Sequence, residues 1–87
     1  MKIKEDFLLR KVADCYVVVP VGKATVDFNG MMILNETGAF LWEKLENDTT
    51  KEELLKAMLD EYEVPEDIAK KDIDNFITKL KDGNLLE

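Results

Sequence analysis

Residues 34–42 read LNETGAFLW, and this stretch marks the change from β-structure to helix. Asn35 belongs to the residue types preferred just before a helix, where a side-chain oxygen accepts a hydrogen bond from an otherwise unpaired backbone N–H. Leu41 and Trp42 begin an apolar stripe at helical spacing, which would face a core. The stretch therefore predicts a helix over residues 36–46 that is capped by Asn35.

Upstream of this stretch the sequence favours β-strands. Phe7–Val12 is one predicted strand, and Cys15–Pro20, which is rich in β-branched and aromatic residues, is a second. Only two residues separate these strands, which predicts a tight connection. A third strand is predicted at residues 31–34, which read MMIL. The Asn29-Gly30 pair ahead of it indicates either a β-bulge or a hairpin turn, and the sequence leaves both open.

Downstream, capping residues and apolar spacing predict two more helices. Thr49 and Thr50 are each followed three residues later by a glutamate, so two overlapping capping boxes can begin the second helix. Pro65 suits the first turn of the third helix, and Gly83 is predicted to end that helix in a left-handed conformation. The third helix has an apolar stripe that is predicted to be buried, made of Ala69, Ile73, Phe76, Ile77 and Leu80.

The order of these elements, three strands followed by three helices, predicts an α+β domain. A three-stranded antiparallel sheet laid against three helices is a winged-helix-like arrangement. The 87 residues correspond to a single domain, 1–87. The apolar runs are too short to cross a bilayer and no signal peptide is recognisable, so a cytoplasmic location is expected.

The net charge and the composition disfavour several classes of partner and of catalytic site. The net charge of −7 disfavours nucleic acid and anionic membrane surfaces, since both are bound mainly through Lys and Arg. The chain has no histidine, which removes the commonest general base and most zinc sites, and its four glycines form no phosphate-binding loop. Its one cysteine, Cys15, is predicted to be a small buried strand residue. No catalytic residue, metal ligand or cofactor is predicted.

Two features indicate a binding surface. Residues 31–34 have no proline and no charge to protect an open strand edge, and their two methionines are flexible side chains that adapt to different partners. One flank of the third helix carries Ile68, Asp72, Asn75 and Lys79, which mix an apolar side chain, an amide and both signs of charge. Two interpretations remain open. In the first, residues 31–34 only contribute to the core and the flank of the third helix is only a solvated face. In the second, the strand and the flank together form a groove that accepts an extended peptide as an added strand.

The spacing of these motifs resembles that of the PqqD family, whose namesake is pyrroloquinoline quinone biosynthesis protein D. The resemblance extends from about residue 7 to residue 86. It rests on the three strands and on Leu34-Asn35-Glu36-Thr37-Gly38, Leu41-Trp42, Thr50, Glu53-Leu54, Asp72-Ile73, Phe76, Leu80 and Gly83. The Asn29-Gly30 pair departs from the family pattern, because it lengthens the region before the third strand.

This resemblance implies a non-catalytic adaptor. PqqD-like domains are RiPP recognition elements, which bind the leader segment of a ribosomally made, post-translationally modified peptide. They present this precursor peptide to a modifying enzyme, commonly a radical SAM protein. The leader adds as a strand to the third strand, against the third helix. Carried over by position, the peptide-binding residues are Val26, Met31, Met32, Ile33 and Leu34 on the strand side and Ile68, Lys71, Asp72, Asn75 and Lys79 on the helix side.

Three further residues, Asn35, Thr37 and Gly38, match the family motif but are interpreted as structural, as a helix cap and a packing contact.

The residues also bear on other functions. A winged-helix transcription regulator would need a basic recognition helix, whereas the third helix interleaves its lysines with Asp and Glu. A self-associating domain could use the same open edge, so the chain is expected to be a monomer or a weak homodimer. An enzyme is disfavoured by the missing histidine.

Overall fold

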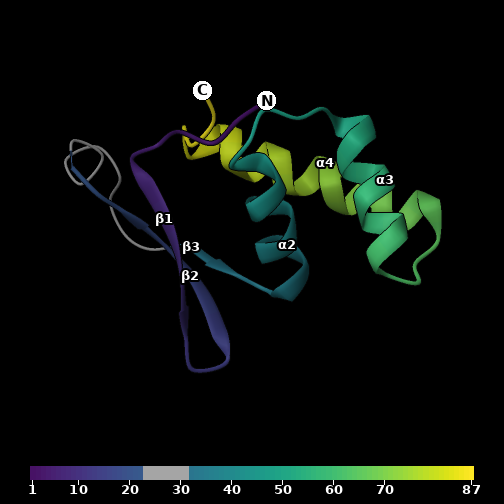
Figure 1. The fold of residues 1–87 in the computed structure, drawn as a ribbon, viewed down its shortest axis with the longest axis horizontal. Helices are drawn as coiled ribbons and strands as arrows, with labels where there is room; N and C mark the ends of the chain where they lie inside the picture. The colour runs from purple at the N-terminus through teal and green to yellow at the C-terminus, as the bar shows by residue number, and fades with distance from the viewer. Residues whose placement is uncertain (23–31) are drawn as a thin grey trace.

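The computed structural model describes residues 1–22 and 32–87. Its elements are β1 (Phe7–Val12), β2 (Cys15–Pro20), β3 (Met32–Leu34), α2 (Glu36–Leu45), α3 (Lys51–Glu61) and α4 (Glu66–Asp82). The predicted α+β order of three strands and three helices is confirmed (Figure 1). Val26, Met31 and the Asn29-Gly30 pair lie outside the described residues, so the choice between a bulge and a hairpin turn stays open.

The sheet is antiparallel, with the strands in the order β1-β2-β3. Two residues join β1 to β2, and Ala13 in this turn has a φ of 56°, a left-handed conformation that is uncommon without glycine. Val12 pairs with Cys15 next to the turn, and Val17 pairs with Ile33 in the short third strand. The register therefore runs without a bulge from the turn through both strand pairs.

The two faces of the sheet differ in burial because side chains alternate along each strand. Phe7, Val18 and Leu34 lie on the face that is buried against the helices. On the other face Leu8, Val12 and Ile33 are exposed, whereas Val17 in the central strand is buried. Cys15 pairs with Val12 on this outer face, beside the turn, and is exposed. The prediction that Cys15 is buried is therefore wrong.

Side-chain caps begin the first two helices as the sequence predicts. The Asn35 side-chain oxygen accepts a hydrogen bond from the backbone N–H of Gly38 at 2.8 Å and caps α2. Of the two threonines, Thr50 caps α3 by accepting from the N–H of Glu53, while Thr49 donates to the Glu53 carboxylate. Pro65 occupies the N-cap of α4, one residue before its predicted place in the first turn.

The end of α4 differs from the prediction at Gly83. Gly83 has a right-handed φ of −84°, and Asn84 is the left-handed residue, with a φ of 60°. The N–H of Leu85 donates to the Leu80 carbonyl and the N–H of Asn84 to that of Lys81, which is the Schellman pattern. Leu80 and Leu85 are both fully buried, so their apolar contact accompanies this cap. The helix ends at Asp82, directly before Gly83, but the left-handed position lies one residue later than expected, at Asn84, and Asn tolerates that conformation.

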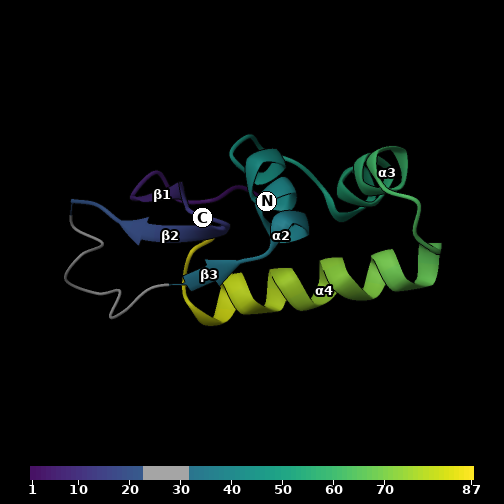
Figure 2. The same ribbon diagram turned by 90° about the horizontal axis from the view of Figure 1, so that it is seen from below.

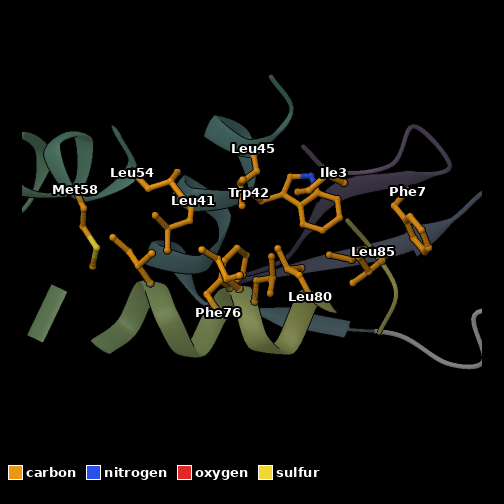
Figure 3. Close-up of a cluster of buried hydrophobic side chains, with 14 of the residues drawn as sticks. Ile3, Phe7, Leu41, Trp42, Leu45, Leu54, Met58, Phe76, Leu80 and Leu85 are labelled. Carbon is orange, nitrogen blue, oxygen red and sulfur yellow. The ribbon is translucent and has the colours of Figure 1, made fainter. Parts of the chain in front are cut away.

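Helix α4 runs along the length of the molecule, with α3 beside its first half and β3 beside its last half (Figure 2). The core lies between α4, α2 and the inner face of the sheet. Figure 3 shows Leu41 and Trp42 of α2 on the side toward Phe76 and Leu80 of α4. The two chain ends lie side by side, and an isolated bridge joins Ile3 to Leu86.

Within the part of the chain that the structure describes, no helix is long and apolar enough to cross a membrane.

Candidate functional site

A groove of about 440 Å³ lies between β3 and α4. The groove brings together two segments that are far apart in the sequence, since the last half of α4 runs beside β3 (Figure 2). Its lining residues are Ile33, Leu34, Asn35, Thr37, Gly38, Leu41, Asp72, Asn75, Phe76 and Lys79. The groove thus joins the predicted strand and the predicted helix flank, together with the segment that begins α2.

The groove has apolar side chains from the core along its base. Leu34, Leu41 and Phe76 come from three different elements, and each is less than a tenth exposed. Gly38 lets the start of α2 pack closely here, because an added Cβ would lie 3.3 Å from the Leu34 Cβ and 3.5 Å from the Phe76 ring. A bound apolar side chain would therefore contact a preformed apolar surface.

The α4 wall of the groove is polar and charged. Asp72, Asn75 and Lys79 stand at i, i+3 and i+7, which places them on one side of the helix. Asp72 and Lys79 lie two turns apart, or about 10.5 Å along the helix axis. Across residues 1–22 and 32–87, the salt bridges present use neither of these two side chains. Both charges are therefore available to a ligand.

The β3 wall offers backbone groups as well as side chains. In an antiparallel ladder, residues alternate between pairs that exchange hydrogen bonds and pairs whose N–H and C=O groups point away from each other. The pair next to a two-residue turn, Val12 with Cys15, is a hydrogen-bonded pair. Counting from it along the continuous register makes Arg10 with Val17 another such pair and directs the backbone of Val17 toward β1. The N–H and C=O of Ile33, opposite Val17, therefore point to the open edge of β3.

The groove contains five of the predicted site residues. They are Ile33, Leu34, Asp72, Asn75 and Lys79. Met32 is half-buried against the core instead. Ile68 and Lys71 are exposed on α4 but do not line the groove, although Ile68 lies one turn before Asp72 on the same flank.

Sequence reasoning assigned other lining residues to purely structural roles. Leu41 and Phe76 were expected only in the core, and the Asn35, Thr37 and Gly38 group only as a cap and a packing contact. Their position in the sequence could have predicted that Asn35, Thr37 and Gly38 line the groove, because they directly follow the edge strand.

Two other hollows lie on the described chain, and neither adjoins the open edge of β3. One of about 460 Å³ lies between α2 and α3 and has Phe40, Lys44 and Glu53 among its lining residues. A smaller hollow of about 190 Å³ lies between α3 and α4, where Lys51 and Asp74 pair with each other at 3.2 Å. Among residues 1–22 and 32–87, no group of three or more His, Cys, Asp or Glu side chains could hold a metal ion. The groove beside β3 is therefore the candidate site.

Comparison with known proteins gives one family and two similar solved structures. The family described as coenzyme PQQ synthesis protein D (PqqD) matches residues 15–86. A structure described as TbiB1 in complex with the TbiA(beta) leader peptide has a TM-score of 0.77 and 25% sequence identity, covering 100% of this chain and 95% of that one. A lasso peptide synthetase B1 complexed with the leader peptide has a TM-score of 0.74 and 20% identity, covering 97% and 93%. No curated protein sequence matches the chain.

Proposed function

Because the chain belongs to the PqqD family, we propose that it is a RiPP recognition element. In this role it binds the leader segment of a ribosomally made precursor peptide and presents it to a modifying enzyme. The similar fold of TbiB1, whose structure contains a leader peptide, supports this function.

The observation that carries the proposal is the open edge of β3 beside the groove. The backbone of Ile33 offers one donor and one acceptor, which is what an incoming strand needs to extend a sheet. Side chains on the inner face of that added strand would enter the groove, above Leu41 and Phe76. Backbone pairing would supply affinity and the groove would supply specificity.

The peptide-binding residues in this proposal follow from the groove. Ile33 and Leu34 contact the peptide from β3, and Asp72, Asn75 and Lys79 contact it from α4. Met32 lies next to Ile33 on β3 but directs its own backbone N–H and C=O to Val18 of β2, while Ile68 and Lys71 extend the surface beyond the groove. Val26 and Met31 remain predictions outside the described residues.

The expected interface is small. A bound strand of about six residues spans about 20 Å. It buries less than about 1,200 Å² in total, which lies at the low end of specific interfaces. A dissociation constant near the micromolar range, about −8 kcal/mol, is therefore expected. Such an affinity suits an adaptor that must release its peptide after modification.

The partner enzyme is a further part of the proposal. A radical SAM protein or another peptide-modifying enzyme would act on the presented precursor, while this chain contributes binding and no catalysis. The cytoplasm, where ribosomal peptides are made, is the proposed location.

An amide NMR titration tests the proposed function. The ¹⁵N-labelled protein is titrated with a synthetic leader segment from a precursor peptide encoded beside its gene. Amide shifts are expected to cluster at residues 32–38 and 72–79, with saturation near micromolar peptide. If the leader produces no shifts while duplex DNA does, the chain is a nucleic-acid-binding protein and the adaptor proposal is wrong.

A further inference from the structure

The two charged side chains of the groove stand at different points along its length. Asp72 and Lys79 are the ionisable side chains among the described lining residues, and two turns of α4 separate them. The apolar base formed by Leu41 and Phe76 lies with them in the same groove. A ligand that follows the groove would therefore meet a negative charge, an apolar surface and a positive charge in that order along α4.

The direction of a bound strand relative to these charges follows from the sheet. Figure 2 shows that β3 and α4 run in opposite directions. Both strand pairs in the sheet are antiparallel, and antiparallel pairing is the slightly more stable kind. A strand added antiparallel to β3 would therefore run in the same direction as α4. Its N-terminal part would lie toward Asp72 and its C-terminal part toward Lys79.

The positions that enter the groove follow from the register. The peptide residue that pairs with Ile33 shares the outer face of the sheet with it, so the residues on either side of it point inward. Inward positions i, i+2 and i+4 span about 13 Å of strand. Asp72 and Lys79 are about 10.5 Å apart along their helix. Flexible charged side chains close this difference, so three consecutive inward positions match Asp72, the apolar base and Lys79.

We propose that the groove selects leader strands by the order of their charges. The preferred segment reads, from its N-terminal end, basic-x-apolar-x-acidic. The basic side chain faces Asp72, the apolar one lies on Leu41 and Phe76, and the acidic one faces Lys79. This inference rests on the proposed function and adds the substrate class to it.

Two synthetic peptides of identical composition test this order. They are the acetylated and amidated heptamers TKTLTET and TETLTKT, which differ only in the exchange of Lys and Glu. Each is titrated into the ¹⁵N-labelled protein at low ionic strength, and the amide shifts of residues 32–38 and 72–79 are followed. TKTLTET is expected to bind about three- to ten-fold more tightly, because exposed ion pairs contribute modestly and two attractions are compared with two repulsions.

A charge exchange in the protein makes the test specific to these two residues. The double variant Asp72→Lys/Lys79→Asp is expected to prefer TETLTKT by a similar factor. The matched control is Lys56→Asp/Asp60→Lys on α3, which exchanges two exposed charges outside the groove and keeps the net charge. This control is expected to retain the preference for TKTLTET. High salt is expected to remove the preference in every variant, since it screens exposed charges.

The possible results separate this inference from the proposed function. Equal affinities with shifts in the groove overturn the charge order and leave peptide binding intact. A wild-type preference for TETLTKT overturns the antiparallel direction and therefore the proposed order. If neither heptamer shifts the groove amides while the leader segment does, the charge order is overturned and peptide binding stands; if the leader segment also produces no shifts, the proposed function itself is overturned.

Discussion

The two outer strands of the sheet differ in what protects their free edges. β1 carries Arg10 and Lys11, which are exposed and charged, and such residues discourage another strand from pairing. β3 has the sequence Met-Ile-Leu, with no charge, and its edge opens onto the groove against α4. Both strands present outward-facing backbone groups, so these groups alone do not mark a binding edge. The side chains on each strand and the surface beside β3 make the difference.

The largest expected effect is that of proline at the open edge of β3. Ile33→Pro removes the backbone N–H that would pair with a peptide, while the pairing of β3 with β2 does not use that group. Leader binding is expected to weaken at least ten-fold, measured by NMR or calorimetric titration. A melting curve recorded beside it checks that the variant is folded.

The matched variant is Lys11→Pro on the other outer strand. Lys11 pairs with Tyr16 one position from the turn pair, so its N–H also points away from β2. Lys11→Pro therefore also removes an outward-facing N–H, but from the strand edge that is not proposed to bind. The affinity for the leader is expected to stay unchanged. Equal weakening by the two prolines would mean that the two edges do not differ as proposed.

A smaller effect is expected from the cap between β3 and α2. Asn35→Ala removes the side-chain oxygen that accepts from Gly38, at a cost of about 1 kcal/mol of folding free energy. Because Asn35 lines the groove, leader affinity is expected to fall as well, by a few-fold.

The control for this cap is Thr50→Ala, which removes the cap of α3. It is expected to lower the free energy of unfolding by a similar amount of about 1 kcal/mol, because the lost interaction is of the same kind. Thr50 lies outside the groove, so leader affinity should not change. Denaturant unfolding and peptide titration of both variants give the comparison. If Thr50→Ala also lost affinity for the leader, the weaker binding of Asn35→Ala would be explained by its lower stability alone.

Local signals were sufficient to predict the elements of the fold. Asn35 and Thr50 mark helix starts by their own side chains, and the apolar spacing of α4 places Ile73 and Leu80 in the core. Local signals could not predict features that depend on how the strands pair. The exposure of Cys15 follows from its pairing with Val12 beside the turn, at the end of the sheet where residues 11–15 are exposed on both faces.

The same distinction applies to the candidate site. Helical periodicity brought Asp72, Asn75 and Lys79 onto one flank, and the structure places all three in the groove. The stripe on α4 also predicted Phe76 as core, but a residue at the border of a stripe contacts both the core and the groove.

The length of the groove was not predictable from the helix alone. The flank from residue 68 to residue 79 extends about 16 Å, whereas the three residues of β3 span about 10 Å. Ile68 therefore lies beyond the strand that forms the opposite wall. Knowledge of the length of β3 was needed to exclude it from the lining.

The smallest expected effect concerns the amide of Asn75, which can distinguish a binding wall from a solvated helix face. Asn75 is exposed on α4 between Asp72 and Lys79, so Asn75→Ala is expected to change the free energy of unfolding by no more than about 0.5 kcal/mol. Leader affinity should nevertheless fall two- to five-fold, because one uncharged hydrogen bond contributes about 1 kcal/mol or less. Thr78→Ala is the control, since Thr78 is exposed on the same helix and does not line the groove. If the two variants bind the leader equally well, the α4 wall contributes only its charges and its apolar base, and the difference between the two edges of the sheet rests on β3 itself.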